Sequence, residues 1–372
     1  MSNHHLPIIS VVIPFYNQRS DLFKDALDSV LSQSYTNWEA IIVNDGSNKE
    51  SKIFLENCVK EVNDERISVI HLDKNQGPSI AYNTGIEAAK GEIITWLDSD
   101  DIHLPWYYEE ILNTFSKNPS LSILVVNCLF YVSLGCIKKI RTNKPFYKLL
   151  EGNEKQENLL EIFKHKIENI FPMPSFRREV FKTIKFDPGI RFGEDNDFYL
   201  QILKNKSLLD RTMVAPIAGY LYRIYPSRNR LTHHVKLKFS EVQKIIKKYN
   251  YNDSSLAYKT IQRYKNSPSW KFSELLDDYF TNGSILNYLN KSFLMTQLTT
   301  ERISSLKVLI DSIFQYKILM PLFGVNSRFT GILFSIKDNM VKKIKKMFYN
   351  HLNKNRDEKV RFYAKRIYKR IF

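Results

Sequence analysis

Two carboxylates one residue apart, Asp98 and Asp100, have a type and spacing that could support chemistry. Carboxylate oxygens are ligands that Mg²⁺ and Mn²⁺ prefer, and the same ions bind diphosphate oxygens. A cation held here would neutralise the charge of a departing diphosphate. Such a short pattern also arises by chance, and Asp195-Asn196-Asp197 repeats it. The alternative interpretation of Asp98–Asp101 is a solvated loop in which an Asp caps the next helix.

The glycine-rich loops that commonly cradle phosphate groups are missing from the sequence. No GxGxxG follows the first apolar run, and neither GxxxxGKS nor GxxxxGKT occurs anywhere. A phosphate-bearing ligand would therefore need another partner, and a cation bound by Asp98 and Asp100 would provide one.

Polar residues follow three apolar runs at the points where those runs end. The runs and their clusters are Ile9–Ile13 with Pro14-Phe15-Tyr16-Asn17, Ala40–Val43 with Asn44-Asp45-Gly46-Ser47, and Ile93–Leu97 with Asp98-Ser99-Asp100-Asp101. Parallel strands of an open sheet end at one edge, where ligands bind in a crevice. We therefore expect the three clusters to meet at a single site.

The elements that would position these clusters alternate between strand and helix. Runs rich in Val and Ile predict strands at Ile8–Ile13, Glu39–Val43, Ile67–Leu72, Ile93–Leu97 and Leu121–Val132. Apolar residues at helical spacing predict helices at Asp21–Leu31, Ser51–Val62, Pro78 to about Gly91, and Pro105 to about Lys117. This alternation predicts an α/β fold with a Rossmann-like, mostly parallel sheet flanked by helices. The most apolar long run, Leu121 to Ile137, is interpreted as one buried strand and its turn.

The composition and periodicity of the sequence change near residue 235. Beyond it Gly and Pro become sparse and long stretches have helical spacing, which predicts an α/β domain over 1–235 and a helical, basic region over 236–372. Of the net charge of +16, residues 337–372 contribute +10, with 13 Lys and Arg against 3 Asp and Glu. The basic character therefore belongs mainly to the C-terminal part of the chain.

The cysteines and the apolar runs indicate the cellular compartment in which the protein is expected. Cys58, Cys128 and Cys136 form no CxxC pair, which disfavours a disulfide framework and fits a reducing compartment. Residues 1–7 lack the pattern of a signal peptide, and no apolar run is long enough to span a bilayer. The sequence therefore predicts a cytoplasmic protein.

Residues 339–372 have the period of amphipathic helices with basic faces. This pattern suits an anionic membrane surface, so residues 337–372 are predicted to attach the protein peripherally to the inner face of the plasma membrane. The alternative is a set of helices packed on their own protein with a solvated basic face. A nucleic-acid partner is disfavoured, because no recognised nucleic-acid motif accompanies the charge.

In their order along the chain, these motifs resemble the family 2 glycosyltransferases, which have the GT-A fold. The resemblance covers about residues 8–235 and rests on Ile9–Asn17, Val43–Ser47, Asn75-Gln76-Gly77, Asn83-Thr84-Gly85, Asp98–Asp101, Phe176–Phe181 and Gly193–Asp197. Tyr82 departs from the family pattern, in which Arg commonly occupies this position. The departure weakens any expectation of a basic contact from that helix.

The resemblance implies donor-binding roles at matched positions. The residues that would surround the nucleotide sugar are Pro14, Tyr16, Asn17, Asp45, Asn75, Gly77, Asn83, Asp98 and Arg223. Asp45 would face the base, Asp98 would lie near the ribose and the cation, and Arg223 would approach the diphosphate. Asp100 would ligate Mg²⁺ or Mn²⁺ together with Asp98. The alternative for Asp45 is an Asx turn that only shapes the loop.

The resemblance places catalysis in Glu194-Asp195, with Asp195 as the general base. The family is inverting, which implies a single displacement in which an acceptor hydroxyl loses its proton to Asp195 and attacks the anomeric carbon. The alternative is that Glu194 and Asp195 are first-turn acids favoured by a helix dipole. His103 is expected to be a pocket-wall residue rather than a metal ligand.

The predicted function is that of a glycosyltransferase of the hexosyltransferase class. It would move a sugar from a nucleotide-diphosphate sugar, with UDP as the default by analogy, to a hydroxyl of a glycan or lipid-linked acceptor in surface polysaccharide synthesis. The absence of QxxRW disfavours a processive synthase. The alternative is a non-catalytic nucleotide-sugar-binding or membrane-adaptor protein on the same fold, which would not turn over nucleotide sugars.

Overall fold

The computed structural model describes residues 9–134, 137–141, 172–215, 217–224, 244–245, 247–249, 342, 344–355 and 357–371. The chain divides into two compact units, of which one comprises Met1–Ile224 with Val341–Phe372 and the other Tyr225–Met340. All the helices and strands named below belong to the first unit.

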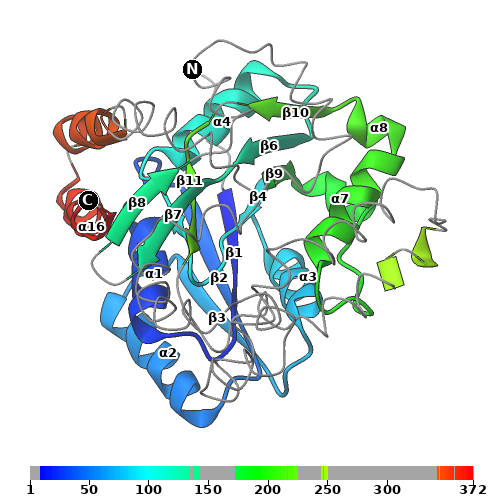
Figure 1. Cartoon of the computed structure of the whole chain (residues 1–372), viewed down its shortest axis with the longest axis horizontal. Helices are drawn as coiled ribbons and strands as arrows, with labels where there is room; N and C mark the ends of the chain where they lie inside the picture. The colour runs from blue at the N-terminus through cyan, green and yellow to red at the C-terminus, as the bar shows by residue number, and fades with distance from the viewer. Residues whose placement is uncertain are drawn as a thin grey trace, which may run out of the picture. The chain divides into compact units, whose positions relative to one another are not determined.

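A seven-stranded sheet forms the centre of this unit (Figure 1), with the strand order β10-β6-β9-β4-β1-β2-β3. Its strands are β1 (Ile9–Phe15), β2 (Trp38–Asp45), β3 (Ile67–Leu72), β4 (Ile93–Trp96), β6 (Ile123–Asn127), β9 (Pro172–Arg177) and β10 (Thr212–Ala215). The four strands from β4 to β3 are parallel neighbours, whereas β9 is antiparallel to both β4 and β6. The prediction of a mostly parallel α/β sheet is confirmed.

Helices cover both faces of this sheet. They are α1 (Ser20–Leu31), α2 (Lys49–Val62), α3 (Pro78–Ala88), α4 (Tyr107–Lys117), α7 (Glu194–Lys204), α8 (Lys206–Leu209) and α16 (Glu358–Ile371), with a 3-10 turn at Arg178–Lys182. On β1, Val11 and Ile13 share a core with Phe23 of α1, while Val12 lies beneath Gly85 of α3. Because the strand is buried on both faces, it is apolar at almost every position.

Gly85 lets α3 approach the sheet closely. A Cβ atom at this position would lie 2.3 Å from Cγ1 of Val12, a distance that only a shift of the helix could relieve. The missing side chain therefore sets the distance between α3 and β1, and with it the position of the first turn of α3.

A second, four-stranded sheet has the order β5-β11-β7-β8. Its strands are β5 (Ile102–His103), β7 (Leu129–Leu134), β8 (Ile137–Arg141) and β11 (Tyr220–Ile224). The prediction of one strand over Leu121–Val132 is wrong, because the chain leaves the first sheet after β6, passes Cys128 and enters the second sheet as β7. Asn127 is the one polar residue at the break, and Cys128 after it is fully buried, so hydropathy gives only a weak sign of the change of sheet.

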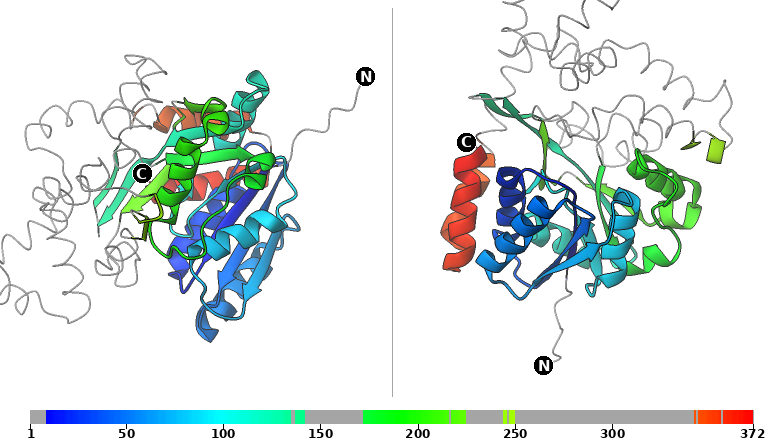
Figure 2. Two further views of the ribbon diagram at one scale, coloured as in Figure 1. Left: turned by 90° about the vertical axis from the view of Figure 1, so that its right-hand side faces the viewer. Right: turned by 90° about the horizontal axis from the view of Figure 1, so that it is seen from below.

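The last helix, α16, packs against α1 (Figures 1 and 2). Its apolar stripe is buried and consists of Val360, Ala364, Ile367 and Ile371. Arg366 Nη2 lies 3.0 Å from Asp28 Oδ2, and Arg370 Nε lies 3.2 Å from Asp25 Oδ1. At least the last helix of the predicted C-terminal region therefore packs on the α/β unit, as the alternative interpretation of its basic face expected.

Candidate functional site

The polar clusters at the strand ends meet at one edge of the large sheet. β1 lies between β2 and β4, and all three run in the same direction. The backbone N–H of Asn17 donates to Ser47 Oγ at 3.0 Å, and the backbone N–H of Asn48 donates to Asn17 Oδ1 at 2.9 Å. Gln18 Nε2 donates to Ser99 Oγ at 3.2 Å, which joins the β1 and β4 loops. The predicted convergence of the three clusters is confirmed.

Asp45, at the end of β2, binds the loop that leads into α3. Its carboxylate accepts hydrogen bonds from Asn75 Nδ2 at 3.0 Å, the Gln76 N–H at 2.7 Å and the Gly77 N–H at 2.8 Å. Gly77 has φ +96°, a conformation that favours glycine. Burial raises the pKa of Asp45, and the two backbone hydrogen bonds act in the opposite direction. Arg191 Nη2 donates to Asn75 Oδ1 at 2.6 Å and joins this loop to the segment before α7.

Asp98 follows β4 and is bound by a tyrosine of α3. The Tyr82 hydroxyl donates to Asp98 Oδ1 at 2.5 Å. The Tyr82 ring is stacked on Phe186, with centroids 4.7 Å apart, and lies 5.4 Å from the Trp96 ring. Burial, together with the neighbouring Asp98 charge, raises the pKa of Tyr82 well above 10, so the hydroxyl is protonated at neutral pH. Tyr82 thus provides a neutral donor at this position.

Glu194 and Asp195 open α7, directly after Gly193. Asp195 is exposed, and Glu194 is partly accessible to solvent. Desolvation by surrounding atoms raises the pKa of Glu194 well above its usual value, and the charges of Asp195 and Asp98 raise it further. The influence of Asp98 means that the start of α7 lies within electrostatic reach of the β4 loop. In Figure 1, α7 and α3 lie on the same side of the sheet.

Two side chains of α3 hold the segment that precedes α7. Asn83 Nδ2 donates to the Phe186 carbonyl at 2.8 Å, and the Phe186 N–H donates to Asn83 Oδ1 at 3.1 Å. Ser79 Oγ donates to the Ile190 carbonyl at 2.7 Å. Asn83 was predicted to border the nucleotide, and in the structure its side-chain amide binds the backbone of Phe186. These contacts fix where α7 begins.

Asp100 and Asp101 differ in their surroundings although they are adjacent. Asp100 is partly exposed, as Asp98 is. Asp101 is fully buried and accepts hydrogen bonds from the Tyr220 hydroxyl at 2.9 Å and the Arg223 N–H at 2.7 Å. Asp101 therefore anchors β11, while Asp98 and Asp100 are accessible to a ligand. Among the described residues, no group of three or more His, Cys, Asp or Glu side chains is arranged to hold a metal ion.

Two predicted site residues lie within the protein interior. His103 is fully buried beside Tyr108, whose hydroxyl is 3.1 Å from Nδ1, and burial lowers the pKa of His103 to about 3. The imidazole is therefore neutral at physiological pH. Arg223 is 4% exposed and its Nη1 lies 3.0 Å from Asp25 Oδ2. The structure thus places this guanidinium in a packing contact with α1, where it stabilises the α1–β11 junction.

Three residues that join these elements were not predicted from the sequence, namely Gln18, Arg191 and, as a partner of Asp98, Tyr82. Most of them make contacts to partners distant in sequence, so spacing along the chain could not reveal them. Tyr82 did leave a signal, because it replaces the Arg that is common in the resembled family.

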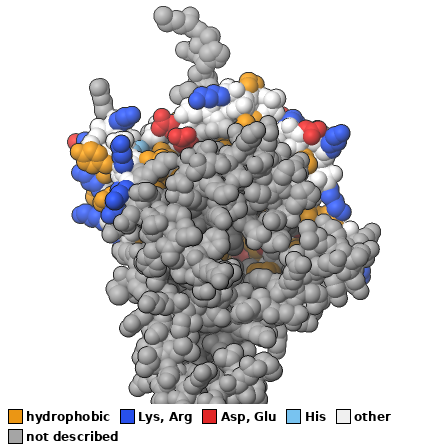
Figure 3. Space-filling view, turned by 45° about the horizontal axis from the view of Figure 1, so that its top comes forward, with side chains coloured by type: hydrophobic (Ala, Val, Ile, Leu, Met, Phe, Trp, Pro, Cys, Tyr) orange, Lys and Arg blue, Asp and Glu red, His pale blue; other side chains and the backbone are white. Residues whose placement is uncertain are grey.

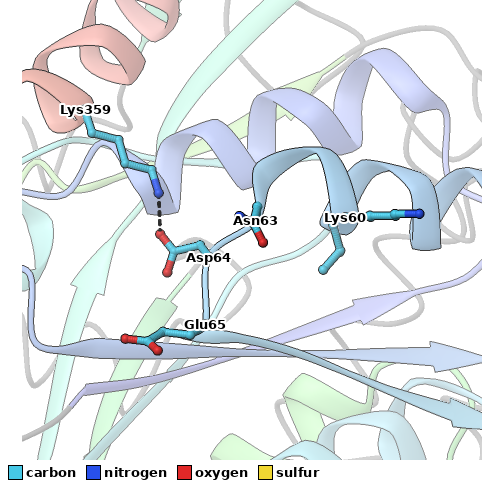
Figure 4. A pocket seen from close by; sticks show the side chains of 6 residues that line it. Lys60, Asn63, Asp64, Glu65 and Lys359 are labelled. Atoms are coloured by element: carbon cyan, nitrogen blue, oxygen red, sulfur yellow. Dashed lines mark hydrogen bonds and ion pairs between the residues drawn. The ribbon is translucent and has the colours of Figure 1, made fainter.

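An open cavity of about 630 Å³ lies away from these residues (Figure 4). It is lined by Val59, Lys60, Asn63, Asp64, Glu65 and Lys359. Lys359 Nζ of α16 lies 3.0 Å from Asp64 Oδ2, and hydrogen bonds from the Arg66 guanidinium hold the pKa of Asp64 well below its usual range. The cavity lies where α2 ends and β3 begins, at the amino end of that strand. It is therefore separate from the candidate site.

The chain is similar to named glycosyltransferases. A glycosyltransferase of Haemophilus influenzae is 34% identical over 203 residues, which cover 54% of this chain and 73% of that protein. EpsJ of Bacillus subtilis is 32% identical over 230 residues, or 60% of this chain, and the chain spans 62% of its length. TuaG of Bacillus subtilis, named for teichuronic acid biosynthesis, is 43% identical over 95 residues, covering 26% of this chain and 36% of that protein.

Among solved structures, Staphylococcus aureus TarS residues 1–349 with UDP-GlcNAc is 16% identical, with a TM-score of 0.49. The match covers 79% of this chain and 77% of that one. The family model described as glycosyl transferase family 2 matches residues 10–185, which include the ends of β1, β2 and β4. The match to the Haemophilus influenzae glycosyltransferase covers more than two thirds of that protein, and the polar clusters of the family-matched span lie at one sheet edge. The chain therefore belongs to glycosyl transferase family 2.

Proposed function

We propose that this protein transfers a sugar, with inversion, from a nucleoside diphosphate sugar to a hydroxyl of a glycan or lipid-linked acceptor. The observation that carries the proposal is that α3 holds both acidic parts of the site, since Tyr82 binds Asp98 after β4 and Asn83 binds the segment that leads to Glu194 and Asp195. The charge of Asp98 also raises the pKa of Glu194. Acidic groups gathered at the carboxyl edge of a parallel sheet fit both a cation-bound donor and a general base.

The donor side of the site consists of the β1 and β2 ends and the loop before α3. Pro14 lies near the end of β1, and Tyr16 and Asn17 follow the strand. Tyr16 is 51% exposed, which makes its ring available to stack on a base. Asp45 holds the loop that contains Asn75 and Gly77, so the nucleoside pocket is preorganised by a buried carboxylate. UDP-sugars are the first donors to test, by analogy with the family.

Mg²⁺ or Mn²⁺ fits the residues on the β4 loop. Asp98 and Asp100 are partly exposed carboxylates two positions apart, and oxygen ligands of this kind suit both ions. The remaining coordination positions would take diphosphate oxygens or water, since no third protein ligand is grouped with them among the described residues. When bound, the cation supplies neutralising charge for the diphosphate leaving group.

The chemical step requires one base. Asp195 is exposed at the first turn of α7 and would accept the proton of the acceptor hydroxyl. The hydroxyl oxygen forms a bond to the anomeric carbon while the bond from that carbon to the diphosphate oxygen breaks, and the electron pair leaves with the nucleoside diphosphate. Glu194 lies next to the base, and its raised pKa disfavours a second negative charge there.

Exchange of the base for its amide tests this assignment. Asp195→Asn should lower kcat at least about 100-fold, the lower end of a general base's contribution, and leave the Kd for UDP with Mn²⁺ nearly unchanged. Asp210→Asn, at an exposed Asp after α8, is the matched control and should keep the normal rate. A near-normal rate for Asp195→Asn would show that the base is another group.

A nucleotide-sugar screen tests the function itself. Thermal unfolding of the full chain is measured with UDP-, GDP- and dTDP-sugars, each with and without Mn²⁺. We expect one nucleotide class to raise the Tm, with a larger shift when Mn²⁺ is present. Binding without any transfer or hydrolysis would favour the alternative of a non-catalytic nucleotide-sugar-binding protein.

The acceptor is proposed to be a growing surface glycan or its lipid-linked precursor. The name of TuaG, which refers to teichuronic acid biosynthesis, supports this class of acceptor. A lipid-linked acceptor would be met at a membrane, and the C-terminal helices supply a surface for that encounter.

This surface differs from the apolar stripes predicted from the sequence, because those stripes are buried. Among the described residues, the exposed large hydrophobic side chains are Tyr16, Ile53, Tyr349 and Phe362, and the last two lie in the C-terminal helices. The exposed lysines of these helices are Lys342, Lys345, Lys346, Lys354, Lys359, Lys365 and Lys369, of which Lys359 pairs with Asp64. Figure 3 shows Lys and Arg gathered with hydrophobic side chains at the left of the view, over these helices. Basic and aromatic groups of this kind favour anionic lipid headgroups.

Flotation of the full chain with anionic vesicles tests the membrane contact. Replacing Tyr349 and Phe362 with Ser should reduce the fraction bound to phosphatidylglycerol-rich vesicles. Ile53→Ser, at an exposed position of α2 where 45% of the residue is accessible, should not. Equal binding of all variants, or no binding by the unaltered chain, would reject the membrane contact.

A further inference from the structure

The contact between Tyr82 and Asp98 joins two elements of the site through a group that carries no charge. Tyr82 belongs to α3 and Asp98 follows β4, and the hydroxyl donates to Oδ1 at 2.5 Å. A Lys or Arg at the same position would also donate to the carboxylate but would add one positive charge. The hydroxyl fixes the carboxylate and leaves its negative charge in place.

The tyrosine itself is held from several sides. Its ring lies between Phe186 and Trp96, and only 6% of the residue is exposed. The neighbouring Asn83 binds the backbone of Phe186 through two hydrogen bonds, and Gly85 seats the helix on Val12. The hydroxyl therefore has little freedom to leave Asp98.

The Asp98 carboxylate lies in acidic surroundings. Its charge acts on Glu194, which is next to Asp195, and Asp100 is two residues away. A negatively charged diphosphate approaching these carboxylates is repelled unless a cation offsets the charge. Tyr82 adds a hydrogen bond to Asp98 but no positive charge, so it leaves this offset to other groups such as a bound divalent cation.

We propose that Tyr82 is a positioning residue for Asp98, and that its hydroxyl orients the carboxylate, without adding a positive charge, to hold the divalent cation with the nucleoside diphosphate. This inference rests on the proposed function. It makes the residue at position 82 one of the groups that determine how strongly donor binding depends on a divalent cation, together with Asp98 and Asp100.

Two substitutions of Tyr82 separate its effect on the position of the Asp98 carboxylate from its effect on the local charge. Tyr82→Phe keeps the ring between Phe186 and Trp96 but removes the donor, while Tyr82→Arg supplies a donor together with a positive charge. Tyr35→Phe, at a partly buried tyrosine between α1 and β2, is the matched control. Circular dichroism and thermal unfolding establish that each variant is folded.

The measurement is Mn²⁺ affinity in the presence of saturating UDP, followed by the electron paramagnetic resonance signal of unbound Mn²⁺, with no turnover required. Tyr82→Phe should weaken Mn²⁺ binding about 10-fold, the effect of losing one hydrogen bond to a charged group. Tyr82→Arg should weaken Mn²⁺ binding by at least as much, while UDP binding without Mn²⁺ becomes tighter than in the unaltered chain. Tyr35→Phe should match the unaltered chain.

The outcomes distinguish this inference from the function on which it rests. Unaltered Mn²⁺ affinity in folded Tyr82→Phe would overturn the positioning role even if sugar transfer is demonstrated. Unchanged Mn²⁺ affinity in folded Tyr82→Arg would overturn the role of charge. If the unaltered chain binds neither UDP nor Mn²⁺ and transfers no sugar, the proposed function fails, and the inference fails with it. If Tyr82→Arg does not fold, the Tyr82→Phe result alone decides the positioning role.

Discussion

Asp45 combines burial with three hydrogen bonds to the loop that opens α3. Its carboxylate receives the side-chain amide of Asn75 and the backbone N–H groups of Gln76 and Gly77, while only 4% of the residue is exposed. A buried carboxylate with this many donors shapes the backbone around it. Asp45 therefore holds the loop before α3 in place, and its contact with a nucleoside stays a prediction.

Replacement of this carboxylate should affect stability as well as binding. Asp45→Asn turns one acceptor into a donor that faces other donors, so the free energy of unfolding should fall by about 1–3 kcal/mol, measured by urea denaturation. Asp73→Asn, an exposed Asp in the same region, should change it by less than about 0.5 kcal/mol. Equal stability of the two variants would contradict the structural role of Asp45.

The sequence predicted where the acidic groups gather but not what each side chain binds. Asp45, Asp98 and Asp100 could be assigned to a sheet edge because they follow apolar runs, and their neighbours in parallel strands are fixed by the fold. The partner of Asp101 is Tyr220, 119 residues away, and no local pattern reveals a hydrogen bond over that separation. The roles of the individual residues in donor binding and catalysis remain predictions.

At the level of helices and strands, the alternating pattern identified β1 to β4 and their helices within a few residues. The failure at Leu121–Val132 has a physical cause, since Asn127, at the end of β6, is the one polar residue where the chain passes to β7, and the chain changes sheets there without a run of polar turn residues. β9 was also unpredicted as an antiparallel strand between β4 and β6, because its two Pro residues argue against a central strand.

The α1–α16 contact contains a carboxylate whose ionisation opposes folding. Burial raises the pKa of Asp28 from 3.8 to about 6, although Arg366 acts in the opposite direction. A raised folded-state pKa in an acid means that stability is lost as the pH rises from about 4 to about 6. The loss from this group is on the order of 3 kcal/mol.

Asp28→Asn should remove that dependence. Between pH 4 and pH 6 the variant should gain stability relative to the unaltered chain, by up to about 3 kcal/mol, in urea denaturation at a series of pH values. Asp21→Asn on the exposed side of the same helix should follow the unaltered chain. A difference between Asp28→Asn and the unaltered chain that stays constant with pH would contradict the assignment.

The buried stripe of α16 makes a second prediction about the same contact. Ala364 is fully buried, so Ala364→Asp would place an unpaired charge between α16 and α1 and should lower the free energy of unfolding by at least about 3 kcal/mol. Lys365→Asp, at the exposed neighbouring position, should be nearly neutral. If Ala364→Asp unfolds like Lys365→Asp, α16 does not pack on α1 in solution.

Over the whole molecule, the charge pattern and the packing give a consistent account of the C-terminal helices. The apolar stripe predicted from the sequence is a buried face, and the lysines lie on the exposed side. In the part of the chain that the structure describes, no helix is both long and apolar enough to cross a bilayer. Periodicity located the two faces of α16, but it could not determine whether protein or lipid covers the apolar one.

The return of Val341–Phe372 to the unit formed by Met1–Ile224 makes Tyr225–Met340 an insertion in chain order. A gene cut after the family-matched span would lose α7 with Asp195 and also α16, which neutralises Asp25 and Asp28. A fragment that keeps both parts of this unit therefore needs an internal excision of Tyr225–Met340 rather than a premature stop codon.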